Sequence, residues 1–161
     1  MKVVYAREPI QEDIRGISKP VFLVGPSPRS IDVQSWRPNA IDIFKQHEFD
    51  GVLYVPEPRE KEGDDTFDYH KQVYWEYRAL AHCREFGAIL AWVPRELKTM
   101  PAFTTNVEFG LHVGSENFFY GRPDNAPKTR YLDFLYKKER RRLPETSIER
   151  LIEQVILHTR P

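Results

Sequence analysis

The chain has 161 residues, which is enough for one domain that buries about 70% of the surface of the unfolded chain. Its 24 basic and 24 acidic residues cancel, so no overall field recruits nucleic acid or an anionic membrane. The single cysteine, Cys83, excludes an internal disulfide and a cysteine-based zinc cluster.

The apolar periodicity predicts strands that alternate with helices along the chain. In chain order we expect an edge strand at 2–5, a strand at 21–24, a helix at 36–48, a strand at 51–55, a helix at 69–86, a strand at 88–93, a helix at 105–114, a strand at 117–120 and helices at 131–142 and 147–158. Residues 57–68 are expected to form a charged loop that contains proline. The expected buried side of the helix at 69–86 consists of Val73, Tyr77, Leu80 and Ala81.

This alternation, with short connections, predicts an α/β domain built on a doubly wound parallel sheet of four to five strands with helices on both faces. A single domain covers 1–161; residues 1–20 are an N-terminal extension or edge strand, and 143–161 carry a C-terminal helix. The first residues lack the apolar stretch of a signal peptide, and the longest apolar runs are too short to span a bilayer. We therefore expect a cytoplasmic protein.

Glu108 is the first candidate for a catalytic residue. It lies near the start of the helix that follows the strand at 88–93, and ligands bind where loops leave the carboxyl ends of parallel strands. Thr105 and Glu108 have the spacing of a capping box, in which both side chains satisfy free N–H groups at a helix start. Alternatively, the helix dipole keeps Glu108 ionised so that its carboxylate attacks the anomeric carbon of a sugar. Asn106 would then orient a sugar hydroxyl or the carboxylate itself.

Gln72 and Glu76 are four residues apart and therefore share one face of the helix at 69–86. Glu76 has no basic residue three or four positions away, so an ion pair within the helix does not explain it. An amide beside a carboxylate can pair with the donor–acceptor edge of a heterocyclic base. An exposed polar helix face is the other interpretation of the same spacing.

The loop Gly25-Pro26-Ser-Pro-Arg29-Ser30 follows the strand at 21–24, which is the usual ligand position of a doubly wound sheet. It has neither the GK[ST] ending of a P-loop nor the GxGxxG of a dinucleotide fold, so ATP and NAD are not indicated. Arg29 and Ser30 can contact a hydroxyl or a phosphate group, whereas Pro-Ser-Pro is also simply a stiff turn. Trp92, at the end of a later strand, either stacks on a base or fills the core.

The remaining polar residues suggest no cofactor. The five histidines show no metal-ligand spacing, and Cys83 has no partner, so no metal is expected. The basic run at 137–142 is interpreted as a solvated helix end, where cations complement the dipole. The expected partner is a small molecule, with no nucleic-acid polymer and no membrane.

Several short motifs occur in one order along the chain. They are Val-Phe-Leu-Val-Gly25-Pro-Ser-Pro-Arg29, Ser35-Trp-Arg37, Phe49-Asp-Gly-Val52, Pro56-Glu57, Gln72-Val-Tyr-Trp75-Glu76, Trp92-Val-Pro-Arg95, Thr104-Thr-Asn-Val-Glu108-Phe-Gly110, Gly121-x-Pro123, Ala126-x-Lys128 and Tyr131-Leu132. This series, over about residues 20–135, resembles the nucleoside 2-deoxyribosyltransferase-like family. The block that contains Glu108 is its most specific element. Beside the motifs the chain departs from the family pattern, with Gly87 where Asp is usual and Ala91 where Phe is usual.

The resemblance implies a flavodoxin-like sheet and an enzyme that cleaves the N-glycosidic bond between a nucleobase and 2-deoxyribose. A glutamate at the position of Glu108 attacks C1′ and releases the base, and the deoxyribosyl-enzyme then passes the sugar to another base. Glu76 binds or protonates the base, while Arg29 and Asn106 hold the sugar side. Further candidates for substrate binding are Gly25, Pro26, Ser30, Gln72, Trp92 and Arg95. Relatives form oligomers whose neighbouring chain helps close the site, so we expect a dimer or a larger assembly.

Two other functions are compatible with the same residues. A hydrolase of deoxynucleosides or their 5′-monophosphates would give the sugar to water, and Arg29 and Ser30 would allow a phosphate contact. A non-catalytic nucleoside or nucleotide sensor would keep the pocket without turnover. Product analysis separates these functions.

Overall fold

Five parallel strands form the centre of the molecule. The computed structural model describes residues 1–10, 19–30, 32–59 and 68–160. The strands are β1 (Lys2–Tyr5), β2 (Pro20–Val24), β3 (Val52–Val55), β4 (Ala88–Trp92) and β5 (Phe118–Gly121). They are arranged in the order β1-β3-β2-β4-β5, and every neighbouring pair is parallel. The flavodoxin-like, doubly wound α/β fold expected from the sequence is thereby confirmed, with β1 at one edge.

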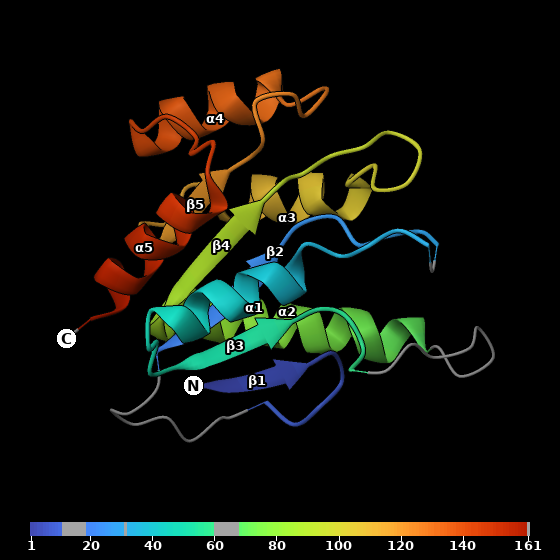
Figure 1. Ribbon diagram of the computed structural model, residues 1–161, viewed down its shortest axis with the longest axis vertical. Helices are drawn as coiled ribbons and strands as arrows, with labels where there is room; N and C mark the ends of the chain where they lie inside the picture. The colour runs from blue at the N-terminus through green and yellow to red at the C-terminus, as the bar shows by residue number, and fades with distance from the viewer. Residues whose placement is uncertain (11–18, 31, 60–67, 161) are drawn as a thin grey trace.

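Helices cover both faces of the sheet (Figure 1). One face carries α1 (Arg37–Gln46) and α5 (Ile148–Thr159), and the other carries α2 (Tyr69–Phe86), α3 (Phe103–His112) and α4 (Arg130–Arg140). Successive side chains of a strand point to opposite faces, so Leu23 packs with α1 and α5 whereas Phe22 packs against α2. β2 and β4 are buried along their whole length, as their continuous apolar runs predict.

Each predicted element is present, with ends within two residues of those expected. The start of α3 shifts from 105 to 103 because Ala102 adopts a left-handed conformation with φ of 63° and its carbonyl accepts the N–H of Asn106. Much of the predicted loop at 57–68, and of the extension at 1–20, lies outside the described residues. Within the described residues, no helix combines the length and the apolar character needed to cross a bilayer.

The buried side of α2 differs from the predicted one. Val73 and Tyr77 were expected on it, but they are 43% and 71% exposed. The buried residues of α2 are Gln72, Trp75, Ala79, Leu80 and Cys83. Both sides of this helix carry large apolar side chains, and the sheet packs against the side where Ala79 and Cys83 allow close approach. As a result, Gln72 and Glu76 turn inward from solvent.

Candidate functional site

The candidate site lies at the carboxyl ends of the strands, which are the arrowheads in Figure 1. After β2 the chain continues to β3 on one side and later to β4 on the other. This change of direction is the switch point at which doubly wound sheets bind ligands. Four charged residues are supplied from different elements: Arg37 begins α1, Glu57 follows β3, Glu76 lies on α2 and Glu108 lies on α3.

Arg37 is buried, with only 1% of its surface exposed. It occupies the first position of α1, where the helix dipole disfavours a cation, and its guanidinium bonds to the end of β2 and the loop that follows it. Nε donates to the carbonyl of Leu23 (3.2 Å), Nη2 to the carbonyl of Gly25 (2.7 Å) and Nη1 to the hydroxyl of Ser27 (3.0 Å). The arginine therefore fixes the course of the loop after β2.

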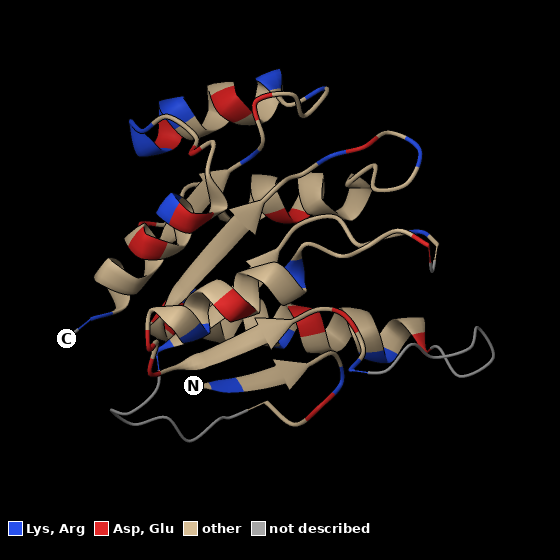
Figure 2. Cartoon of the chain, in the orientation of Figure 1, with Lys and Arg blue, Asp and Glu red and all other residues tan. Residues whose placement is uncertain are grey.

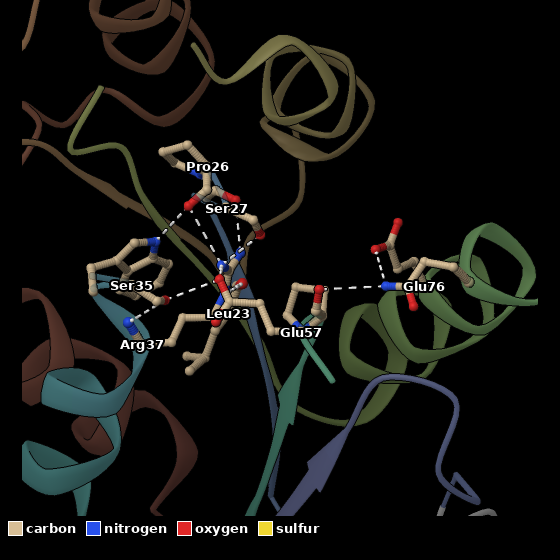
Figure 3. A network of polar contacts seen from close by, with 11 residues as sticks. Leu23, Pro26, Ser27, Ser35, Arg37, Glu57 and Glu76 are labelled. Atoms are coloured by element: carbon tan, nitrogen blue, oxygen red, sulfur yellow. Dashed lines mark hydrogen bonds and ion pairs between the residues drawn. The ribbon is translucent and has the colours of Figure 1, made fainter. Parts of the chain in front are cut away.

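Glu57 is the charge partner of Arg37 (Figure 3). Its Oε1 lies 2.5 Å from Arg37 Nη1 and also accepts a hydrogen bond from the Ser35 hydroxyl at 3.0 Å. The Arg37 side chain is 1% exposed and that of Glu57 is 19% exposed. The ion pair thus has its positive end inside the protein and its negative end nearer to solvent.

Gln72 holds Glu76 from the same helix. Its Nε2 donates to Glu76 Oε1 at 2.7 Å and to the carbonyl of Pro56 at 3.4 Å. Because a carbonyl oxygen can only accept, this second contact determines the orientation of the amide. Burial raises the pKa of Glu76, while the hydrogen bond from Gln72 and the charge of Arg37 partly offset that rise. Gln72 was expected to contact substrate; the structure uses its amide nitrogen to position Glu76.

Glu108 has no hydrogen-bond or ion-pair partner among the residues that the structure describes. The capping box with Thr105 does not form, because the helix begins at Ala102 without a side-chain cap and Thr105 is already within the helix. Burial, followed by the charge of Glu76, raises the pKa of Glu108 to about 8, and the charge of Arg37 opposes the rise. Burial therefore favours the protonated form of Glu108 in the free protein, against the expectation that the helix dipole keeps it ionised.

Glu76, Glu108 and Arg37 form one electrostatic unit. Glu76 raises the pKa of Glu108, and Arg37 lowers the pKa of both carboxyls. The charge of Glu76 therefore favours the protonated form of Glu108. Two carboxyls whose charges interact in this way can carry out general acid–base or nucleophilic chemistry.

Arg95 fixes Asn106. It is buried in the loop after β4, where it donates one hydrogen bond to Asn106 Oδ1 and another to the carbonyl of Lys128 at 2.5 Å. Arginine has no acceptor atom, so the atom of Asn106 that faces it is the oxygen, and the exposed amide nitrogen remains free to donate. Arg95 was expected to bind substrate; in the structure it positions Asn106 and the Lys128 loop.

Gly25, Pro26 and Trp92 belong to the supporting structure of the site. A Cβ atom on Gly25 would lie 2.2 Å from the carbonyl oxygen of Trp92, so only glycine fits there. The carbonyl of Pro26 accepts a hydrogen bond from Trp36 Nε1 at 3.2 Å. Trp92 is 6% exposed and packs in the core on the α1 and α5 side, whereas Glu76 and Glu108 lie on helices of the opposite side. Of its two interpretations, the structure supports core filling.

Arg29 and Ser30 are exposed at the end of the same loop. The guanidinium of Arg29 lies over the ring of Phe103, 5.3 Å from its centroid, at the start of α3. The Arg29 N–H donates to the carbonyl of Thr99, which joins the loops after β2 and β4. Arg29 and Ser30 therefore lie at the rim of the candidate site. The charge of Arg29 is not among the causes that shift the pKa of Glu76 or Glu108.

Arg37 and Glu57 were not among the predicted site residues. Both residues stand in the motif series, in Ser35-Trp-Arg37 and Pro56-Glu57. Arg37 gave a further signal, because arginine at the first turn of a helix opposes the dipole and needs another reason to be there. Glu57, in contrast, follows a proline in a charged stretch and looks like any solvated loop residue. Their pairing depends on β2 and β3 being neighbours, which no local pattern specifies.

A hollow lies at the opposite, amino ends of the strands. It has a volume of about 570 Å³ and is open to solvent; its lining includes Lys19, Arg84, Glu116, Asn117 and His158. Charges of both signs line it, so it favours no one class of ligand. Within the described residues, no group of three or more His, Cys, Asp or Glu side chains is arranged to hold a metal ion.

The chain matches no protein-family model, and a search of curated proteins finds no relative.

Proposed function

We propose that this protein is a nucleoside 2-deoxyribosyltransferase-like enzyme, which cleaves the N-glycosidic bond of a 2′-deoxynucleoside and transfers the sugar to another base. The main support is the pair Glu76 and Glu108, whose charges interact beside the buried Arg37. Glu108 has no partner in the described part of the chain, which leaves both of its oxygens available to a ligand. Carboxyls with perturbed pKa values at the ligand end of a sheet are typical of catalytic sites.

In the first half-reaction Glu108 is the nucleophile and Glu76 is the acid. In the reactive form of the pair the proton has moved from Glu108 to Glu76, so that Glu108 is ionised and the pair has one negative charge. An oxygen of Glu108 forms a bond to C1′ while the C1′–N bond breaks, and the bonding electrons leave with the base. Glu76 gives its proton to the base nitrogen that receives these electrons.

The second half-reaction reverses these roles with a different base. A nitrogen of the acceptor base attacks C1′, the glutamyl ester bond breaks, and Glu108 regains its carboxylate. The proton of the acceptor nitrogen passes to Glu76. Two displacements at the same carbon give net retention of configuration. Because the two carboxyls and the two bases account for each proton and electron pair, the reaction needs no cofactor.

Asn106 and Arg29 are placed on the sugar side in this proposal. Asn106 lies two positions before Glu108 on α3, and its free amide nitrogen can donate to a deoxyribose hydroxyl. Arg29 and Ser30 lie at the rim beside the start of α3, where they can reach the 5′ group of the sugar. Both contacts orient C1′ toward Glu108.

Incubation of the protein with a deoxynucleoside and a second free base tests the proposal. The expected product is the exchanged nucleoside, identified by chromatography, and Glu108→Ala should abolish its formation. Undiminished exchange in Glu108→Ala would contradict the mechanism.

The same assay separates the alternative functions. A hydrolase would release free deoxyribose, or deoxyribose 5′-phosphate from a nucleotide, without an acceptor base; the exposed Arg29 beside α3 favours testing the monophosphate. A sensor would bind the nucleoside without forming any product. These outcomes differ in the products alone, so one experiment distinguishes all three.

We also propose that the chain forms a homo-oligomer through the helices that carry the two carboxyls. This apolar helix face consists of the exposed residues Tyr69, Val73, Tyr74 and Tyr77 on α2, Phe103, Val107 and Leu111 on α3, and Tyr131 and Phe134 on α4. On α1 and α5, by contrast, Leu157 is the exposed large hydrophobic residue within the described part of the chain. An extended apolar surface of this kind favours a self-complementary contact with a second copy.

Light scattering coupled to size-exclusion chromatography tests the oligomer. The wild-type protein is expected to be a dimer or larger, and Val107→Asp on α3 should shift it toward the monomer. Leu157→Asp on α5 is the matched control and should leave the mass unchanged. A monomeric wild-type protein would contradict this part of the proposal.

A further inference from the structure

The two carboxyl oxygens of Glu76 lie in different environments (Figure 3). Oε1 accepts a hydrogen bond from Gln72 Nε2 at 2.7 Å. Oε2 has no hydrogen-bond partner among the described residues and is not one of their buried, unpaired polar atoms, so it reaches solvent. In Figure 3 it points away from the contact with the amide. One oxygen of Glu76 is therefore engaged within α2, and the other is open.

We propose that Gln72 is a positioning residue that keeps the proton of Glu76 on Oε2, the oxygen from which it can pass to the leaving base. The acid role of Glu76 rests on the proposed function, whereas the choice between its two oxygens rests on the contacts of Gln72. Gln72 touches no reacting atom in the proposed mechanism, so it acts only through Glu76.

The hydrogen bond between Gln72 and Glu76 assigns the proton to one oxygen. In a protonated carboxyl the hydroxyl oxygen donates, and the carbonyl oxygen is the better acceptor. Gln72 Nε2 can only donate, so it pairs best with the carbonyl oxygen, and its contact at Oε1 leaves the proton to Oε2. The same contact suits the ionised carboxylate. Gln72 therefore needs no rearrangement when Glu76 gains or loses its proton.

The carbonyl of Pro56, directly after β3, fixes which end of the Gln72 amide faces Glu76. It accepts from Nε2 at 3.4 Å, so one amide nitrogen donates to both groups. A flipped amide would place its oxygen against the carbonyl oxygen of Pro56, where two acceptors repel. That oxygen would also accept the proton of Glu76 and hold it on the side away from a ligand. Gln72 is only 8% exposed, so water does not readily replace either contact.

The consequence for the proposed chemistry is a proton with a defined direction of transfer. The base needs it as the C1′–N bond breaks and the bonding electrons move to the base, and the transfer requires hydrogen-bonding distance. A proton on Oε2 of Glu76 can reach a base nitrogen, whereas Oε1 is occupied by Gln72. In the second half-reaction Oε2 receives the proton of the acceptor base. Loss of Gln72 should therefore slow the departure of a base that needs a proton and spare a base that leaves without one.

Two substrates that differ by one methyl group separate these cases. Guanine leaves 2′-deoxyguanosine as an anion unless it is protonated. The base of 7-methyl-2′-deoxyguanosine already carries a positive charge, so 7-methylguanine leaves as a neutral molecule without a proton. In Gln72→Met, kcat for release of guanine should fall by at least about tenfold, and kcat for release of 7-methylguanine by less than about threefold.

Gln154→Met is the matched control, because Gln154 on α5 donates in the same way to a carboxylate outside the candidate site, Glu145 Oε1, at 2.5 Å. Its kcat should stay near that of the wild-type protein for both substrates. Equal losses for both substrates in Gln72→Met, as a merely structural role would give, would overturn the inference, and so would an unchanged release of guanine. Should Gln72→Met fail to fold, Gln72→Asn, whose amide is one methylene group shorter, takes its place.

Infrared spectroscopy of the free protein tests the position of the proton without substrate. The C=O stretching band of protonated Glu76 is identified by its loss in Glu76→Gln. In Gln72→Met this band should move to higher frequency, because the carbonyl oxygen loses its donor, and an unmoved band would overturn the inference. The band also decides if the wild-type protein does not accept the methylated substrate. If the wild-type protein transfers the sugar of no deoxynucleoside, the proposed function fails, and the band still shows which oxygen carries the proton.

Discussion

Glu57 and Glu108 are two carboxylates at the same end of the sheet in opposite environments. Glu57 accepts hydrogen bonds from Arg37 and Ser35 and balances a buried charge. Glu108 has no partner in the described structure, and burial raises its pKa to about 8. Folding satisfies polar groups that serve structure, because an unpaired buried group costs free energy. A carboxyl left unpaired in such a setting is therefore the one available for a ligand.

The largest expected effect is the loss of activity when Glu108, the unpaired carboxyl of this comparison, is replaced. Glu108→Gln keeps the shape of the side chain and removes the nucleophile, so kcat for sugar transfer should fall by on the order of 10³-fold or more. The thermal midpoint should not fall, because no described contact is lost. Circular dichroism and the exchange assay measure the two effects. Loss of fold in Glu108→Gln would show that Glu108 is structural after all.

Disruption of the Arg37–Glu57 ion pair should have the opposite outcome, because its main effect should be a loss of stability. Arg37→Met leaves Glu57 without its cation and three fixed acceptors without a donor, which should cost about 3–5 kcal/mol in the free energy of unfolding by urea. Lys45→Met is the control, because its ion pair with Asp42 is exposed and should contribute less than about 1 kcal/mol. Equal losses in both variants would contradict the structural role of Arg37.

The raised pKa of Glu108 predicts how stability depends on pH. Between its ordinary value of 4.5 and about 8, the folded protein binds more protons at Glu108 than the unfolded chain does. The stability contributed by this site is therefore greatest below pH 4.5 and is lost as the pH rises through 8. Relative to wild type, Glu108→Gln should gain stability over this window, by up to a few kcal/mol at about 1.4 kcal/mol per pKa unit. A constant difference in urea midpoint between pH 5 and 9 would exclude the shift.

Substitutions at two glycines are expected to give the smallest changes in stability. They compare the supporting loop after β2, at Gly25, with the helix that carries Glu108, at Gly110. Gly25→Ala places a methyl group against the backbone of Trp92 and should destabilise the protein by about 1–3 kcal/mol. Gly110→Ala on α3 meets nothing within 4 Å and should stabilise the helix by about 0.5–1 kcal/mol. Differential scanning calorimetry measures both changes. Destabilisation by Gly110→Ala would mean that this face of α3 is packed against something, such as a second copy.

Much of the fold could be predicted because its signals are local. The apolar runs at 21–24 and 88–93 match strands buried on both faces, and proline and glycine mark where they end. The buried side of α2 could not be predicted, since Val73 and Tyr77 are as apolar as the residues that the sheet selects. The start of α3 was also misplaced, because the left-handed Ala102 is a strained conformation that tertiary packing must support.

The sequence by itself determined the order of strands and helices along the chain and the position of the loops at the carboxyl ends of the strands. It also determined Glu76 and Glu108 as candidate catalytic residues. Those features follow from periodicity and from residue type within a few positions of the chain. Only the tertiary structure decided that Arg37 pairs with Glu57, that Gln72 and Arg95 support neighbouring side chains, and that burial raises the pKa of Glu108. Charge–charge distance and exclusion of water set these properties, and both depend on which distant segments the sheet brings together.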